Sequence, residues 1–153
     1  MPEISQSAPD FTLPSTGGDD VTLSALKGQP VVLFFYPRDD TPGCTKESVG
    51  FSENKTAFEE AGAKVFGISK DSMASHEKFV TKRSLEIPLL SDENGTVCED
   101  YGVWKEKNMY GKKYMGIERT TYLIAADGTV AQVWNKVKVP GHVDAVLAAV
   151  RAL

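Results

Sequence analysis

The sequence predicts an α/β domain with a central mixed β-sheet flanked by helices and with a β-hairpin near its N-terminus. The first reason is that apolar runs rich in β-branched and aromatic residues, which are typical of strands covered on both faces, alternate with segments of helical pattern. The second reason is a Gly-Gly-Asp-Asp turn and an Asp-Gly turn, each lying between two short β-rich stretches. The third reason is a C-terminal segment with the apolar period of an amphipathic helix.

Length, composition and charge limit the classes of protein to consider. The chain has 153 residues, which suits one domain spanning residues 1–153, and its 41% hydrophobic and 25% charged residues are those of an ordinary globular protein. The formal net charge is −4 without a basic stripe, which argues against nucleic acid and anionic membranes as partners. No apolar run approaches the ~20 residues of a membrane-spanning helix, and the first residues do not resemble a secretory signal. We therefore expect a cytoplasmic protein.

The first third of the chain contains three expected strands. Phe11–Leu13 and Val21–Leu23 are predicted to pair across the Gly-Gly-Asp-Asp turn as the N-terminal hairpin. Pro30–Tyr36, with the sequence PVVLFFY, is a continuous apolar run and is predicted to be a strand that is covered on both faces.

Helical segments and strands alternate in the middle of the chain. Residues 42–61 can form one long helix, and the segment Ala63–Ser69 repeats the pattern of a buried strand. Asp71–Arg83 is predicted to be a helix because it begins with two residues that favour the N-cap position. A shorter helix is expected over Asn94–Tyr101.

The last part of the chain predicts a second hairpin and a final helix. Thr120–Ala125 is rich in β-branched and aromatic residues and leads into the Asp127-Gly128 turn. The apolar face of the final helix contains Val143, Val146, Leu147, Val150 and Leu153. The predicted order is therefore strand, helix, strand, helix, strand, helix, hairpin and helix, with parallel strand pairs early and an antiparallel pair late.

The few cysteines and histidines limit the possible chemistry. The two cysteines are Cys44 and Cys98, and the two histidines are His76 and His142. They are not closely spaced, so they make a poor zinc site and no disulfide framework, and we expect neither a metal nor another cofactor. In a reducing compartment a functional cysteine is catalytic or redox-sensing, but Cys98 can equally be a buried structural thiol.

Cys44 lies where a thiolate would be stabilised. It follows a buried strand across a short loop and is placed at the start of the next helix, where free N–H groups and the helix dipole favour an anion. A free thiol with a pKa near 8.5 is only a few per cent ionised at pH 7. A helix terminus supplies only ~0.3–2 kcal/mol toward the thiolate, so a cation is expected to contribute as well.

Arginine is the better candidate for that cation. His76 falls in the middle of a predicted helix and His142 beside the final one, so both are expected to be solvated or satisfied rather than catalytic. Arg119 directly precedes a buried strand, which is a common place for a side chain that points into a site, although such an arginine is also often solvated. Asp39 and Asp40 are expected to be turn and surface residues.

The residues around Cys44 suggest further contacts. Thr41 lies three residues earlier, so its hydroxyl can cap the helix, hydrogen-bond a small ligand over the sulfur, or do both. Pro42 and Gly43 let the backbone come close to such a ligand, because they add little side-chain bulk. Glu47 lies three residues after Cys44 and either orients an arginine or is a solvated helix residue.

Five separated segments carry a likeness to one enzyme family: FFYPRDDTPGCTKE, YMGIERTTYLI, APDFTLPSTGG, PLLSDENG and YGVW. Together they resemble the peroxiredoxins, specifically the bacterioferritin-comigratory-protein or PrxQ subfamily. The family pattern Pro-x-x-x-Thr-x-x-Cys is met by Pro37, Thr41 and Cys44, and Arg119 matches the family's active-site arginine. The resemblance covers nearly the whole chain.

The resemblance implies a thioredoxin-like fold and a thiol peroxidase that reduces hydrogen peroxide and organic hydroperoxides. Cys44 is then the residue that becomes a sulfenic acid, and Pro37 shields it. Thr41, Arg119 and the backbone N–H groups of Gly43 and Cys44 are expected to stabilise the developing negative charge. The expected reductant is thioredoxin, glutaredoxin or a low-molecular-weight thiol, and the expected oligomeric state is a monomer. A thioredoxin-type disulfide exchange is disfavoured because Cys44 is followed by Thr-Lys-Glu and not by a Cys-x-x-Cys motif.

The route by which Cys44 is recycled stays open. Many members of the subfamily have a resolving cysteine at the position of Val49, and others have one at the position that corresponds to Val80. Because both positions are valine in this chain, neither resolving thiol is present. The sequence favours a one-cysteine enzyme reduced by an external thiol, and the alternative is resolution by Cys98 within one chain or between two. A second function is also open, in which oxidised Cys44 forms mixed disulfides with partner proteins as a redox sensor.

Overall fold

The computed structural model describes residues 1–153, and its centre is a five-stranded mixed sheet. The strand order is β5-β4-β3-β8-β9. These strands are β3 (Val31–Phe35), β4 (Lys64–Ser69), β5 (Leu89–Ser91), β8 (Thr120–Ile124) and β9 (Val130–Trp134). Strand β4 runs parallel to β3 and β5, whereas β8 runs antiparallel to β3 and β9. The predicted mixed sheet, with its early parallel pairs and late hairpin, is confirmed.

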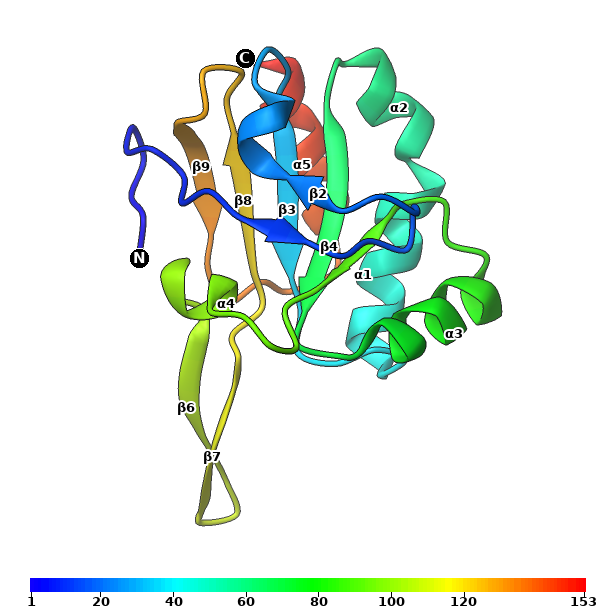
Figure 1. The fold of residues 1–153 in the computed structure, drawn as a ribbon, viewed down its shortest axis with the longest axis vertical. Coiled ribbons are helices and arrows are strands. Elements are labelled where there is room, and N and C mark those ends of the chain that lie inside the picture. Colours follow the sequence, from blue (N-terminus) through cyan, green and yellow to red (C-terminus); the bar gives the residue numbers. More distant parts are fainter.

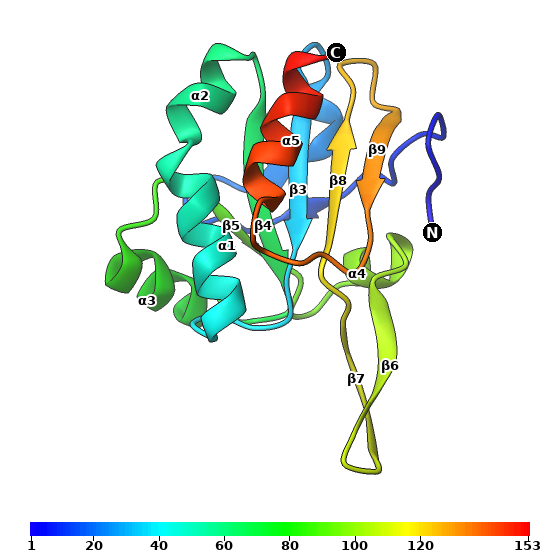
Figure 2. The ribbon, with the colours of Figure 1, turned by 180° about the vertical axis from the view of Figure 1, so that it is seen from behind.

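Helices cover one face of the sheet, and the N-terminal segment covers much of the other (Figures 1 and 2). The helical face carries α1 (Pro42–Glu53), α2 (Lys55–Glu60) and α5 (His142–Arg151). The opposite face carries β1 (Thr12–Leu13), β2 (Val21–Thr22), the 3-10 turn η1 (Leu23–Leu26) and α4 (Val97–Asp100). Helix α3 (Met73–Arg83) lies beside α1 (Figure 2). The antiparallel pair of β1 and β2 confirms the predicted N-terminal hairpin.

The side chains of β3 alternate between two apolar cores. Val31, Leu33 and Phe35 pack with residues of the N-terminal segment and of α4, and Cys98 belongs to this core. Val32, Phe34 and the residue after the strand, Tyr36, pack with residues of α1, α2 and α5, and Cys44 belongs to that core. Because a strand points successive side chains to opposite faces, the sheet lies between the two cysteines.

Residues 42–61 form two helices instead of the single one that the sequence predicted. Helix α1 ends at Glu53, and α2 begins at Lys55. Between them Asn54 has φ −99° and ψ 9°, and its side-chain amide donates to the carbonyl of Gly50 at 2.8 Å. An asparagine side chain that competes for backbone groups in this way interrupts a helix.

A hairpin that the sequence analysis did not predict extends away from the sheet (Figure 1). It consists of β6 (Trp104–Met109) and β7 (Lys112–Ile117), which pair antiparallel. Tyr110 and Gly111 at its tip have φ values of 52° and 80°, as a two-residue hairpin turn requires. Most of its residues are exposed and many are charged, so the alternation of apolar and polar residues that marks a half-buried strand is weak.

The remaining predicted helices differ from the structure mainly in length. Helix α3 begins after Ser72, whose hydroxyl accepts from the N–H of Ser75 as an N-cap does. Helix α4 is shorter than the predicted segment, and the apolar face of α5 is buried as predicted, except that Leu153 lies beyond the helix and is exposed. None of the helices has the length and apolar character needed to cross a membrane.

A glycine in β4 determines how closely the aromatic core packs beneath α1. A Cβ atom at Gly67 would lie 2.7 Å from Cζ of Phe34 and 2.8 Å from Cδ2 of Leu89. The ring of Phe34 in turn stacks on Phe51 of α1, with their centroids 4.5 Å apart. Gly67 therefore allows the contact through which the sheet supports the helix that carries Cys44.

We expect Gly67→Ala to destabilise the protein by about 1–3 kcal/mol, because the added methyl group overpacks a core that has no room for it. The change is measured as the free energy of unfolding in urea. Gly17→Ala is the matched control, because Gly17 is exposed, its φ is not positive, and the nearest neighbour of an added Cβ would be Oγ of Ser15 at 3.3 Å, so we expect a smaller effect there. Equal stability of the two variants would contradict the close packing around Gly67.

Candidate active site

Cys44 and Arg119 are brought together from distant parts of the chain. Cys44 lies in the first turn of α1 and is 1% exposed. Arg119 lies just before β8, and its Nη2 atom donates a hydrogen bond to Sγ of Cys44 at 3.2 Å. A guanidinium at this distance stabilises a thiolate over a neutral thiol, so the cation expected from the sequence is in place.

The glycine before Cys44 makes this contact possible. A Cβ atom at Gly43 would lie 3.1 Å from Nη2 of Arg119, which is closer than most side-chain carbons approach another atom. The guanidinium therefore lies directly against the backbone at the start of α1.

Glu47 holds the guanidinium from its other side. Its Oε1 atom accepts from Nη1 of Arg119 at 2.7 Å, and the Glu47 side chain is completely buried. The alternative of a solvated helix residue is therefore wrong. Burial raises the pKa of Glu47 to about 7, although the charge and the hydrogen bond of Arg119 act in the opposite direction. Removal from water thus outweighs the ion pair, and Glu47 gains or loses its proton near neutral pH.

His142 lies behind Glu47 and does not contact the sulfur. Its Nε2 atom shares a hydrogen bond with Oγ1 of Thr121 at 2.8 Å and is 4.0 Å from Oε2 of Glu47. Burial lowers the pKa of His142 to about 4, and the charge of Arg119 acts in the same direction. His142 is therefore neutral at pH 7, in agreement with the expectation of a satisfied histidine.

Thr41 occupies the N-cap position of α1 without capping it. Its hydroxyl donates to the carbonyl of Arg38 at 3.0 Å, and no side-chain cap bond is formed. The first backbone N–H groups of a helix have no partner within the helix, so those of Gly43 and Cys44 remain available to a ligand. Pro37 is exposed and lies two residues after the end of β3.

Lys107 of β6 is a second cation near this site, and the sequence analysis missed it. Burial lowers the pKa of Lys107 and so does the charge of Arg119, whereas the charge of Cys44 acts in the opposite direction. Its side chain runs over Gly116 of β7, with Cδ and Cε at 3.2 and 3.4 Å from the place of a Cβ atom there. The turn-forming glycine in YGKK was the one signal for the hairpin that brings this lysine to the site.

Cys98 lies on the other side of the sheet from this site, and its thiol is not activated. It is completely buried in the core on the opposite side of the sheet from Cys44, and both cysteines are free. Burial raises the pKa of the Cys98 thiol well above its usual range, and the carboxylate of Asp92 acts in the same direction. At neutral pH Cys98 is therefore a protonated, enclosed thiol.

The expectation for Asp39 was wrong, because this residue is buried and not part of the surface. Its carboxylate accepts hydrogen bonds from the side chains of Tyr36 and Ser75. Asp40 does lie at the surface, where it forms ion pairs with Lys82 and Arg83 of α3. The sequence could not distinguish the two neighbours because their burial depends on where α3 packs.

Comparison with known proteins gives one consistent family. The model of the AhpC/TSA family matches residues 4–133. Peroxiredoxin Bcp of Xanthomonas campestris is 47% identical over 150 residues, covering 98% of this chain and 94% of that protein. Peroxiredoxin Bcp of Escherichia coli is 44% identical over 140 residues, covering 92% of this chain and 90% of that protein.

Solved structures agree with the sequence relatives. The bacterioferritin comigratory protein of Xanthomonas campestris, solved in work on its alkyl peroxide reduction activity, superposes with a TM-score of 0.90 at 46% identity, covering 99% of this chain and 97% of that one. A mutant of PrxQ from Xylella fastidiosa gives a TM-score of 0.93 at 37% identity, with the same coverage of 99% and 97%. The thioredoxin-like fold that the resemblance implied is therefore confirmed.

The raised pKa of Glu47 predicts a specific dependence of stability on pH. The folded protein binds this proton more tightly than the unfolded chain, whose Glu47 pKa is near 4.5, so stability falls as the pH rises from about 4.5 through about 7. Glu47→Gln removes this titration. We expect the stability of the natural protein, relative to the variant, to fall between about pH 5 and pH 8, as measured by urea unfolding. A difference between the two proteins that is independent of pH would contradict the burial of an ionisable Glu47.

Proposed function

Because this chain belongs to the AhpC/TSA family and is a thiol-dependent peroxidase of the Bcp/PrxQ peroxiredoxins, we propose that Cys44 is the residue that reduces its hydroperoxide substrates. The observation that carries this assignment is the hydrogen bond from Arg119 to the Cys44 sulfur at 3.2 Å. The other cysteine is enclosed on the far side of the sheet. Alkyl hydroperoxides are the proposed substrates because reduction of alkyl peroxides is the activity studied in the Xanthomonas campestris relative.

The proposed reaction is attack by the Cys44 thiolate on the distal oxygen of the peroxide. The S–O bond forms while the O–O bond breaks, the sulfur becomes a sulfenic acid, and the departing alkoxide takes a proton to leave as an alcohol. Negative charge that was concentrated on sulfur spreads over two oxygens during this step. In this proposal Arg119 and the free N–H groups of Gly43 and Cys44 stabilise that charge. The Thr41 hydroxyl donates to the carbonyl of Arg38, so its oxygen can accept a hydrogen bond from the O–H of the peroxide. We assign Pro37 the role of shielding the sulfenic acid.

We propose that an external thiol recycles Cys44. The sulfenic acid condenses with a first thiol to give a mixed disulfide and water. A second thiol then attacks this mixed disulfide, which releases Cys44 as a thiol and joins the two external thiols in a new disulfide. Direct condensation with Cys98 is disfavoured, because the two thiols belong to cores on opposite faces of the sheet. A dithiol such as thioredoxin or glutaredoxin supplies both thiols at once, and a low-molecular-weight thiol can act twice.

One chain carries all the groups that the proposed reaction requires. Arg119 contacts both Cys44 and Glu47 of the same chain, which supports a monomer as the catalytic unit. We place the protein in the cytoplasm, where reduced thiols are maintained and can recycle Cys44.

Replacing each cysteine separately tests these assignments. We expect Cys44→Ser to abolish peroxide consumption, because it removes the nucleophile. We expect Cys98→Ser to leave the first oxidation intact, with one added oxygen on the intact protein after one equivalent of peroxide, as measured by mass spectrometry. A loss of two hydrogens in the natural protein that disappears in Cys98→Ser would show that Cys98 resolves Cys44 and would overturn the one-cysteine route.

The absence of a resolving cysteine at Val49 and Val80 also supports a second candidate function, that of a redox sensor. A sulfenic acid without a partner in its own chain lasts long enough to capture a thiol of another protein. Continuous turnover of peroxide with a thiol donor supports the enzyme, whereas a single oxidation that ends in a stable mixed disulfide with a protein supports the sensor.

A further inference from the structure

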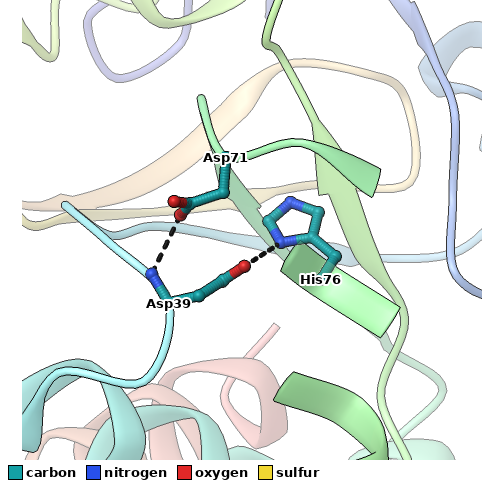
Figure 3. Close-up of side chains that lie close together, drawn as sticks. All are labelled: Asp39, Asp71 and His76. Carbon is teal, nitrogen blue, oxygen red and sulfur yellow. Dashed lines mark hydrogen bonds and ion pairs between the residues drawn. The ribbon is translucent and has the colours of Figure 1, made fainter. Parts of the chain in front are cut away.

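The loop before Cys44 is fastened to α3 by a buried polar cluster that the proposed peroxide chemistry does not use. Figure 3 shows its centre, where Asp39 from the loop lies between Asp71 and His76. His76 belongs to α3 and is completely buried, and Asp71 follows β4. The cluster thus joins three segments that are far apart in the sequence.

Both nitrogens of His76 face hydrogen-bond acceptors. Its Nε2 atom is 2.9 Å from the carbonyl oxygen of Leu90 in β5, and its Nδ1 atom is 2.7 Å from Oδ2 of Asp39. A carbonyl oxygen can only accept, so Nε2 must donate. The Nδ1 atom and the carboxylate oxygen lie within hydrogen-bond distance, so this bond joins α3 directly to Asp39.

The carboxylate of Asp39 collects further donors. Its Oδ1 atom accepts from the hydroxyl of Tyr36 at 2.6 Å, and its Oδ2 atom also accepts from the hydroxyl of Ser75 at 2.8 Å. The backbone N–H of Asp39 donates to Oδ2 of Asp71 at 2.9 Å, and that oxygen also accepts from the hydroxyl of Ser69 at 2.6 Å. Asp39 is therefore held through both its side chain and its backbone.

A metal ion is a poorer explanation of this cluster than a hydrogen-bonded clamp. Ligand atoms of Asp39, Asp71 and His76 do lie within 4.8 Å of one another. Each of the three residues is already engaged by the donors or acceptors described above, and both nitrogens of His76 are occupied. A metal would have to displace these bonds, so the cluster needs no ion to satisfy its polar groups.

The clamp acts on the segment that leads into the active site. Asp39 lies between Tyr36, the residue after β3, and Thr41, the N-cap of α1. The Thr41 hydroxyl is bound to the carbonyl of Arg38, which directly precedes Asp39. Arg119, which is held by Glu47 of α1, fixes the sulfur of Cys44. Nothing in that ion pair fixes the loop on the other side of the helix start.

We propose that Asp39 and His76 are positioning residues for peroxide reduction. Their bond holds the loop against α3, and with it Thr41 and the free N–H groups of the first turn of α1, in the geometry that receives the peroxide over Cys44. The proposal rests on the peroxidase function assigned to Cys44. It separates two properties of the site: reactivity of the sulfur, which depends on Arg119, and alignment of the peroxide, which depends on the clamp.

Two amide variants of His76 test the Asp39 bond separately from the Leu90 bond. The side-chain nitrogen of asparagine can take the place of Nδ1, so His76→Asn keeps a donor for Asp39 and loses the bond to Leu90. The nitrogen of glutamine can take the place of Nε2, so His76→Gln keeps the bond to Leu90 and loses the one to Asp39. Both variants remove most of the ring, so a role that is only structural would affect them alike.

The experiment compares two reactions of Cys44 in protein that also carries Cys98→Ser. The rate of oxidation by hydrogen peroxide reports alignment, and the rate of alkylation by iodoacetamide reports the reactivity of the sulfur. We expect His76→Gln to slow oxidation by about tenfold or more while alkylation changes by less than about threefold. We expect His76→Asn to retain oxidation within about threefold of the parent protein. Asp40→Asn is the matched control on the same loop, because it breaks only exposed ion pairs to α3, and both rates should stay unchanged.

Equal effects of the two His76 variants on oxidation, or equal losses in oxidation and alkylation, would overturn the positioning role. Thermal unfolding of each variant shows whether it is folded at the assay temperature. If both His76 variants unfold there, Asp39→Asn replaces them: loss of the carboxylate should slow oxidation more than alkylation, and proportional losses would overturn the proposal. A parent protein that peroxide does not oxidise at all would instead contradict the peroxidase function itself.

Discussion

The contact between the guanidinium of Arg119 and the sulfur of Cys44 is the interaction on which the rest of the site depends. It brings a permanent positive charge to within 3.2 Å of a thiol at the start of a helix, in a place that is almost closed to water. Glu47 fixes the guanidinium from the opposite side at 2.7 Å, and Gly43 leaves room for it to lie against the backbone. A helix terminus alone contributes about 0.3–2 kcal/mol, and the close cation adds a second influence that favours the thiolate.

The candidate catalytic residues could be identified from the sequence, whereas the residues that surround them could not. Cys44, Thr41 and Arg119 stand in short motifs next to buried strands, and the strands themselves are marked by continuous apolar runs. The pairing of Arg119 with Cys44 came from the family resemblance, because residue spacing does not show which strand ends meet. The burial of Asp39 and the lysine contributed by the β6–β7 hairpin depend on tertiary packing, so local pattern predicted the first wrongly and missed the second. The break at Asn54 depends on one side-chain hydrogen bond, which helical periodicity does not reveal.

The sheet is the structural reason for proposing that an outside thiol recycles Cys44. Cys44 and Cys98 lie in different cores on its two faces, so a disulfide between them would require much of the fold to open. Cys98 is also held as a protonated thiol by burial, which removes its nucleophilic form. On the side of α1, the hydrogen bond between Asp39 and His76 ties the loop before Cys44 to α3. In the proposed mechanism, the sulfur and the surface that receives the peroxide are thus supported by separate parts of the structure.

The ionisation of Cys44 is the property that tests this account most directly. It can be measured as the ultraviolet absorbance of the thiolate at neutral pH in Cys98→Ser protein, with the protein that also carries Cys44→Ser as the blank. The account predicts that Arg119→Ala sharply lowers the thiolate absorbance of folded protein, because the nearest cation is lost. An absorbance that is unchanged by Arg119→Ala would contradict the central claim, since the ionisation of the sulfur would then not depend on the guanidinium.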